Sequence, residues 1–400
     1  MEPIYHSILD NDFYKITMQF AVTKLYPDVQ AKYAFINRGK HEFPEGFGEE
    51  LKKQVRAMAE LALTKEEKKY LQDNCPYISP SYLDFLQGYR FDPDEVKITQ
   101  DGTDLQVHVE GNWYRTILWE VPLLALICEL YYKMTKAERI SDEEVKQRTS
   151  DKIDLYNRLD ANVADFGTRR RHSYEVHDLV MQELTTHTGK SFVGTSNVHF
   201  AHKYNVKPIG THAHEWFMFH GARFGYKIAN AISLDRWVKV FYGDLGIALS
   251  DTYTSEIFFR QFDKKHSKLF DGVRHDSGDP IEFAKMTIAH YEKMGINPLH
   301  KTIIFSDGLN SEKVETISNF CKGKIGISFG IGTNLTNDVG LRAMNIVMKL
   351  TEISSYDLPW TGVVKLSDEG NKHTGKPRDI ELAKEILQLG DIEKHDEVLQ

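Results

Sequence analysis

Length, composition and charge exclude several classes of protein. The chain has 400 residues, of which 41% are hydrophobic and 27% charged, and its formal net charge is −8. These values exclude pervasive disorder and a coiled coil, and they lack the basic excess expected of a nucleic-acid partner. The most apolar stretch, residues 117–132, contains Glu120, Pro122 and Glu129 and is shorter than the roughly 20 residues of a membrane span. We therefore expect a core helix there and no membrane partner.

The cysteine pattern indicates a reducing compartment. Cys75, Cys128 and Cys321 lie far apart, with no CxxC motif and no even number to pair. The first residues also lack the basic region followed by an apolar region that is typical of an export signal. We expect a cytoplasmic protein.

Residues 1–140 are predicted to form an N-terminal α/β domain. Apolar spacing predicts helices over 13–25 and 49–63, and strands over 33–38, 96–100 and 105–111. The turn Gln100-Asp101-Gly102 joins the last two strands and is a hairpin signal.

Residues 141–345 contain one pattern repeated about seven times: a short apolar run, a polar cluster and a helix-like stretch. The clusters are DFGTRR (165–170), GTSN (194–197), GTHAHE (210–215), SDTY (250–253), RHDSGDP (274–280), SDGLN (306–310) and FGIGTN (329–334). Alternating strands and helices predict a parallel sheet, here an irregular β/α barrel resembling a TIM barrel. In such a barrel the strand ends meet on one face, so the polar clusters should share one active site.

Residues 346–400 are expected to pack back onto the N-terminal domain. We predict strands over 343–354 and 362–367, a mobile polar segment over 366–379, and a helical tail from Ile380.

The loop around Gly330, Gly332 and Thr333 follows an apolar strand. Glycines let backbone amides approach a phosphate closely, and a late barrel loop is a common phosphate site. The alternative is a tight turn without a ligand.

RHDSGDP brings a cation and two carboxylates together. Arg274 is suited to bind an anion, and Asp276 to accept from sugar hydroxyls or to hold a divalent ion beside a diphosphate. Asp279 precedes Pro280, a pairing typical of a helix N-cap, so a structural role is favoured for Asp279.

GTHAHE places His212 and His214 at a predicted strand end, where alternation would put both on the same side. Three interpretations stay open: a metal pair, a nucleophilic imidazole that accepts a phosphoryl group, or structural histidines. For phosphoryl transfer, Asp251 could orient the imidazole, with Glu215 as its rival.

DFGTRR offers groups for a flat anionic ligand. Phe166 could stack on a ring, and Arg169 or Arg170 could clamp a carboxylate or a phosphate. The sequence has no GxxxxGK[ST] motif and no GxGxxG motif at the start of a βαβ unit, so neither of these nucleotide loops is supported.

Taken together with DNDFYKITM (10–18), these motifs occur in the order seen in the nicotinate phosphoribosyltransferase family, which the chain resembles over nearly its whole length. The resemblance implies synthesis of nicotinate mononucleotide and diphosphate from nicotinate and 5-phosphoribosyl 1-diphosphate, in NAD biosynthesis. It also implies coupling to ATP hydrolysis through a phosphohistidine, classification as a ligase with glycosyl-transfer chemistry, Mg²⁺ carried by the diphosphate, and a homodimer with shared sites.

The resemblance also implies roles for individual residues. His214 would be the phosphohistidine, with Asp251 and Asp276 as catalytic partners. The expected nicotinate contacts are Tyr14 (from the neighbouring subunit), Phe166, Arg169, Ser196, Thr211 and Arg274. The expected phosphoribosyl diphosphate contacts are Asp276, Gly330, Gly332 and Thr333.

Position 196 bears on the choice between nicotinate and nicotinamide. Relatives that use the amide carry an acid where Ser196 stands, and a carboxylate there would repel nicotinate. The neutral serine therefore favours nicotinate.

The same residues allow two other functions. A metal-dependent barrel hydrolase would use His212 and His214 as ligands, and a non-catalytic nucleotide sensor would keep the pocket without turnover. Neither explains the order of the motifs.

Overall fold

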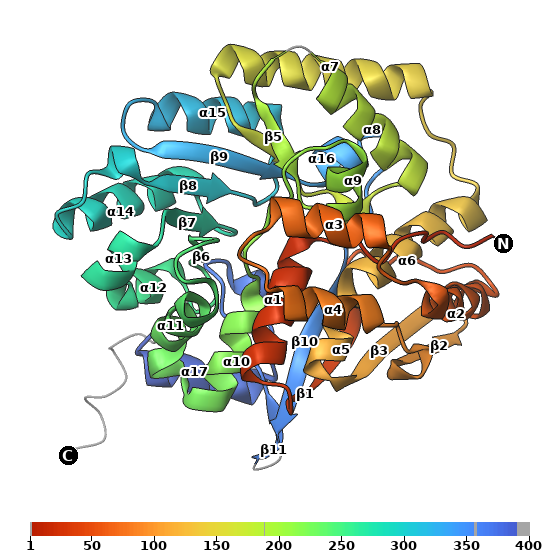
Figure 1. The fold of residues 1–400 in the computed structure, drawn as a ribbon, viewed down its shortest axis with the longest axis horizontal. Coiled ribbons are helices and arrows are strands. Elements are labelled where there is room, and N and C mark those ends of the chain that lie inside the picture. Colours follow the sequence, from red (N-terminus) through yellow and green to blue (C-terminus); the bar gives the residue numbers. More distant parts are fainter. Residues whose placement is uncertain (1, 188, 356–357, 390–400) are drawn as a thin grey trace, which may run out of the picture.

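The computed structural model describes residues 2–187, 189–355 and 358–389 and contains two sheets (Figure 1). The first sheet is antiparallel, in the order β11-β10-β1-β3-β2. Its strands are β1 (Gln30–Asn37), β2 (Val96–Asp101), β3 (Asp104–Asn112), β10 (Ile346–Ser355) and β11 (Leu358–Gly362). The predicted hairpin is confirmed as β2 and β3.

The predicted return of the C-terminal strands is also confirmed, because β10 pairs with every residue of β1. The strand predicted over 362–367 is wrong. The last strand of this sheet is β11, and the chain then leaves the sheet, with only an isolated bridge between Lys365 and Thr374. The backbone N–H of Leu366 instead donates to the carbonyl of Thr252, so the chain crosses to the loop after β6.

The second sheet is parallel, in the order β5-β4-β9-β8-β7-β6. Its strands are β4 (Val163–Asp165), β5 (Phe192–Thr195), β6 (Ile247–Leu249), β7 (Gly272–His275), β8 (Thr302–Phe305) and β9 (Gly326–Ile331). The expected parallel sheet is therefore present.

The strand predicted before GTHAHE is not regular. Residues 207–211 lie in the gap between the edge strands β5 and β6: Ile209 N–H donates to the Thr195 carbonyl, and Thr211 Oγ1 to the Ile247 carbonyl. Pro208 has no N–H to donate to a ladder. Gly210 lies so close to α1 that a Cβ there would be 2.8 Å from the backbone nitrogen of Tyr14. Both features prevent a regular strand.

Helices alternate with the parallel strands, as the sequence predicts, and α7 precedes the first of these strands. They are α7 (Asp142–Leu159), α8 (Tyr174–Thr186), α9 (Val198–Lys203), α10 (His214–Phe224), α11 (Ala229–Phe241), α12 (Ser255–Gln261), α13 (Lys264–Leu269), α14 (Pro280–Lys293), α15 (Ser311–Cys321) and α16 (Thr333–Thr336). The side chain of Asp279 accepts from the backbone N–H groups of Ile281 and Glu282, which confirms its predicted N-cap role.

The remaining helices surround the first sheet and its contact with the second. They are α1 (Phe13–Leu25), α2 (Phe47–Ala57), α3 (Lys65–Asn74), α4 (Pro80–Gly88), α5 (Trp113–Thr116), α6 (Glu120–Thr135) and α17 (Pro377–Leu387). The predicted helix over 49–63 is shorter and ends in a 3-10 turn over Met58–Glu60. The apolar stretch is the buried helix α6, as expected. Within the described ranges, no helix has both the length and the apolar character needed to cross a bilayer.

An aromatic core fixes α10 against the first sheet. Trp113, at the end of β3, stacks on Trp216 with ring centroids 6.3 Å apart and meets Phe219 at 4.5 Å. Helix α1 lies between the two sheets in Figure 1, and its residues from Phe13 to Val22 are buried. The start of α10 is therefore held firmly between the two layers.

Candidate active site

Three neighbouring cavities lie around the ends of the parallel strands. The His214 cavity, about 260 Å³, is lined by β10 of the first sheet and by residues that follow strands of the second sheet, among them Asp276 and Ser306. The glycine-loop cavity, about 370 Å³, is lined by Gly332 and its neighbours. The Tyr14 cavity, about 390 Å³, extends from α1 into the parallel sheet.

The cavities share residues and so form one site. Arg169 lines all three, Tyr14 lines the first and third, and Phe166 and Arg274 line the second and third. The sequence-predicted residues that line at least one of them are Tyr14, Phe166, Arg169, Ser196, Thr211, His214, Arg274, Asp276, Gly330, Gly332 and Thr333. Asp251, by contrast, is buried and lines none of the three cavities.

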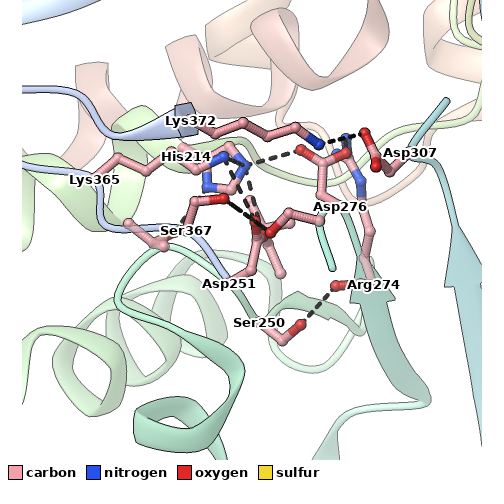
Figure 2. Close-up of polar contacts among 12 residues, drawn as sticks. His214, Ser250, Asp251, Arg274, Asp276, Asp307, Lys365, Ser367 and Lys372 are labelled. Carbon is pink, nitrogen blue, oxygen red and sulfur yellow. Dashed lines mark hydrogen bonds and ion pairs between the residues drawn. The ribbon is translucent and has the colours of Figure 1, made fainter. Parts of the chain in front are cut away.

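His214 is the first residue of α10 and faces its cavity. Its Nδ1 is 3.0 Å from Thr252 Oγ1, while its Nε2 is 2.9 Å from Asp276 Oδ2 and 2.8 Å from Lys365 Nζ (Figure 2). Burial and the charge of Lys365 lower the pKa of His214. The imidazole is therefore neutral at pH 7 and can present a nitrogen lone pair.

Asp276 connects this imidazole to Arg274. Its Oδ1 accepts hydrogen bonds from Arg274 Nη2 at 2.9 Å and from Ser306 Oγ at 2.8 Å. Burial opposes its ionisation, but the Arg274 charge and the His214 hydrogen bond hold the pKa of Asp276 well below its usual range. The carboxylate is charged and fixes both neighbours.

Asp251 does not contact the imidazole as closely as expected. Its Oδ1 lies 3.7 Å from His214 Nε2, beyond hydrogen-bonding distance, and its Oδ2 accepts from Ser277 Oγ at 2.6 Å. Lys365 Nζ is 3.5 Å from the same Oδ2. Asp276 is therefore the acid that can orient His214, while Asp251 faces the lysine.

The predicted common side for His212 and His214 is wrong. His212 is fully buried, accepts from the backbone N–H of Leu249 at 3.2 Å and packs edge-on against Trp237. Burial lowers its pKa to about 3. Strand alternation does not apply here because α10 begins at His214. The arrangement argues against a metal pair and makes His212 a structural residue.

Glu215 is also excluded as the orienting acid. Its carboxylate accepts from Lys15 Nζ at 2.5 Å, and from the Tyr33 hydroxyl and Trp113 Nε1 at 3.3 Å each. These partners lie on α1 and the first sheet, so its carboxylate is engaged away from the His214 ring.

The glycine loop follows β9. Gly330 is needed because the Phe166 ring lies against it: a Cβ would be 2.9 Å from Phe166 Cγ and nearer still to Cδ2 and Cε2. At Gly332 the nearest atom to a Cβ would be the Phe166 carbonyl oxygen at 3.3 Å. The glycines therefore let the loop pass Phe166, and Thr333 then starts the four-residue helix α16.

Tyr14 and Ser196 lie in the Tyr14 cavity of the chain itself. The resemblance implies a Tyr14 supplied by the neighbouring subunit, but here the chain's own Tyr14 reaches the cavity. Ser196 Oγ donates to Asp12 Oδ1 at 2.7 Å, and burial raises the pKa of that carboxyl. A carboxyl group thus lies directly behind the serine.

The comparisons with known proteins agree on one family. Residues 161–390 match the model of the "Nicotinate phosphoribosyltransferase (NAPRTase) family", and residues 9–128 match its N-terminal domain. The chain belongs to the nicotinate phosphoribosyltransferase family.

Individual relatives are similar over almost their whole length. A nicotinate phosphoribosyltransferase of Chromohalobacter salexigens is 60% identical, covering 96% of this chain and 98% of the relative. One of Desulforapulum autotrophicum is 48% identical, covering 96% and 99%. The crystal structure of a nicotinate phosphoribosyltransferase of Porphyromonas gingivalis aligns with a TM-score of 0.94 and 46% identity, covering 96% of this chain and 100% of that one.

In this member of the nicotinate phosphoribosyltransferase family, cations of the His214 cavity come from segments that sequence reasoning missed. Arg38 follows β1, Lys349 lies in β10, and Lys365 and Lys372 follow β11. Burial, with Arg38 and Lys365, lowers the pKa of Lys349 to about 7. No carboxylate of the described residues pairs with Lys349, whose Nζ donates to Thr374. The wall is suited to an anion.

The polar segment predicted to be mobile is tied across the strand ends. Ser367 Oγ lies 2.9 Å from Ser277 Oγ, Asp368 accepts from the Ser255 backbone N–H at 2.7 Å, and Lys372 pairs with Asp307 at 2.9 Å (Figure 2). These contacts hold Lys365 against the imidazole. In the sequence, Lys365 falls in the strand predicted over 362–367 and Lys372 in the polar segment, and neither position indicated a cavity wall.

Proposed function

We propose that the chain transfers the phosphoribosyl group of 5-phosphoribosyl 1-diphosphate to nicotinate, giving nicotinate mononucleotide and diphosphate, with ATP hydrolysis coupled through phosphorylation of His214. The observation that carries this proposal is a neutral imidazole joined through Asp276 to Arg274, at the junction of an anion-binding cavity, a glycine-lined cavity and an aromatic cavity. Family membership supports the same reaction.

The glycosyl transfer needs positioning and charge stabilisation more than acid–base chemistry. The pyridine nitrogen attacks C1 of the ribose as the bond from C1 to the diphosphate oxygen breaks. Tyr14 and Phe166 offer aromatic faces for the ring in the Tyr14 cavity, with Arg169 and Thr211 available for its carboxylate. Arg274, oriented by Asp276 and Ser306, would stabilise the leaving diphosphate.

Gly330, Gly332 and Thr333 would hold the sugar phosphate in the glycine-loop cavity, and Asp276, which lines the adjoining His214 cavity, would accept from the sugar.

ATP would use the cationic wall of the His214 cavity. Attack of His214 Nε2 on the γ-phosphorus forms the N–P bond and releases ADP. The contact with the Asp276 carboxylate needs a proton on Nε2, so the attack requires the other tautomer, in which Nδ1–H donates to Thr252, Nε2 gives up Asp276, and Lys365 is the donor that covers the Nε2 lone pair. Lys365 can turn to an incoming phosphate, which uncovers the nucleophile. The new phosphoryl charge would lie beside Lys365 and reorganise the site.

Mg²⁺ is proposed as a partner of the diphosphate rather than a protein-held ion. Ligand atoms of His214, Asp251 and Asp276 lie within 4.8 Å of one another, but Lys365 already places a positive charge among them. Asp251 Oδ1 is buried without a hydrogen-bond partner. The lysine among these groups therefore argues against an ion held by the protein alone, and Mg²⁺ would arrive bound to the phosphate oxygens of its substrate. Such an ion would neutralise phosphate charge.

Nicotinate is proposed over nicotinamide because the neutral Ser196 lines the Tyr14 cavity, where a carboxylate at that position would repel the carboxylate of nicotinate. We further propose a homodimer, a cytoplasmic location in keeping with three free, buried cysteines, and a barrel completed by residues 207–211 between β5 and β6.

Labelling tests the phosphohistidine. The wild-type chain, incubated with radiolabelled ATP and Mg²⁺, should take up acid-labile phosphate on the peptide that carries His214, and His214→Ala should take up none. His300→Ala removes an exposed histidine far along the chain and should label normally. Label retained in His214→Ala would overturn the assignment.

A further inference from the structure

A buried lysine links the two halves of this site. Lys15, on α1, has a fully buried side chain, and its Nζ lies 2.6 Å from Glu120 Oε2 and 2.5 Å from Glu215 Oε2. Glu120 begins α6 and Glu215 is the second residue of α10, so one ammonium group joins three helices. Both carboxylates line the His214 cavity.

The charges around Lys15 do not balance without Arg169. One lysine faces two carboxylates, and buried charges are costly unless they are paired. The nearest further cation is Arg169, whose Nη1 lies 3.6 Å from Glu120 Oε1. Its Nε lies 3.7 Å from Asp12 Oδ2. Arg169 therefore balances the excess negative charge of this cluster without donating a hydrogen bond to it.

These two distances leave the guanidinium available. Both exceed hydrogen-bonding length, so the attraction to Glu120 and Asp12 consumes none of the N–H groups of Arg169. The side chain of Arg169 is 42% exposed, and it lines all three cavities. An anionic substrate can thus take a bidentate contact that no carboxylate of the described residues occupies.

We infer that Lys15 is a positioning residue for substrate binding: by holding Glu120 at 2.6 Å, it keeps that carboxylate from capturing Arg169 and leaves the arginine free for an anionic substrate. The inference rests on the proposed function, and it assigns Lys15 no contact with the reacting atoms. Without the lysine, Glu120 would form a direct ion pair with Arg169 and compete with nicotinate or with 5-phosphoribosyl 1-diphosphate for the same guanidinium N–H groups.

Lys15→Met tests this role because it removes the charge and keeps most of the buried volume. We expect KM for one of the two anionic substrates to rise about tenfold, equivalent to about 1.4 kcal/mol of binding, with a smaller change in kcat. The calorimetric Kd for that substrate should rise in parallel. Lys301→Met is the matched control: Lys301 is also buried, but its Nζ donates to the Phe270 carbonyl, remote from the site, and its loss should leave KM unchanged.

A second substitution separates positioning from simple stability. Lys15→Met/Glu120→Gln removes the competing charge as well, so KM and Kd should return to within about threefold of wild type. An unchanged KM and Kd in folded Lys15→Met, or no recovery in the double variant, would overturn the inference.

If Lys15→Met does not fold, Glu120→Gln alone tests the inference. It should bind both substrates within about twofold of wild type, and a tenfold weakening would show that Glu120 anchors Arg169 and would refute the inference. Absence of nicotinate mononucleotide in the wild-type assay would instead refute the proposed function. The comparison of Kd values among the variants would still test the positioning role of Lys15.

Discussion

Gly330→Ala gives a prediction that can be worked from the structure. Gly330 pairs with Ala164 in the parallel sheet and lies under the Phe166 ring. An added Cβ would be 2.9 Å from Phe166 Cγ and closer to two other ring atoms, whereas carbon atoms need about 3.5 Å. The ring must therefore move by about 1 Å, or the strand must shift.

Phe166 forms part of both the glycine-loop cavity and the Tyr14 cavity, so its displacement should disturb both substrates. A displacement of about 1 Å can cost about 100-fold in rate, and we expect kcat/KM for nicotinate to fall by that order. The free energy of unfolding should fall by about 1–3 kcal/mol from overpacking. Steady-state diphosphate release and urea titration measure the two quantities.

Gly88→Ala is the matched control. It makes the same change at the end of α4, where a Cβ would meet nothing within 4 Å. Activity should stay unchanged, and stability should rise by at most about 1 kcal/mol. If Gly330→Ala kept kcat/KM within threefold of wild type, Phe166 would not be a wall of the working site.

Three further predictions concern stability. Asp10→Asn should cost about 3–5 kcal/mol in urea titrations, because Asp10 holds the fully buried Arg171 through two hydrogen bonds of 2.8 Å; a loss below 1 kcal/mol would contradict this. Burial opposes the ionisation of Asp10, but the charge of Arg171 lowers the pKa of Asp10 below its unfolded value of about 3.9. The free energy of unfolding of the wild-type chain should therefore fall as the pH drops below about 4, and a flat profile down to pH 3 would contradict this. Asp279→Ala should lose about 1 kcal/mol from the α14 N-cap with kcat/KM unchanged, and a large activity loss would give Asp279 a direct role.

The sequence predicted the meeting of the polar clusters because parallel strands end on one side of their sheet. Phe166, Arg274 and Thr333 come together for that reason, although they lie far apart in the chain. Prediction failed where local geometry broke the repeat. Pro208 and Gly210 prevent a regular strand, and the early start of α10 places His212 in the core while His214 faces the cavity.

The cations of the His214 cavity could not be predicted in the same way. Lys365 lies in a segment predicted to be a strand and Lys372 in one predicted to be mobile, and only the fold shows that both lie across the strand ends. Lys15 lies in a helix whose burial on all sides becomes apparent only once both sheets are in place. Long-range charge pairing leaves no periodic signal in a sequence.

Substrate turnover tests the central claim most directly. The purified chain should convert nicotinate and 5-phosphoribosyl 1-diphosphate, with ATP and Mg²⁺, to nicotinate mononucleotide and diphosphate, with a higher kcat/KM than for nicotinamide. Faster turnover of nicotinamide would contradict the proposed substrate, and absence of the mononucleotide with either base would contradict the proposed reaction.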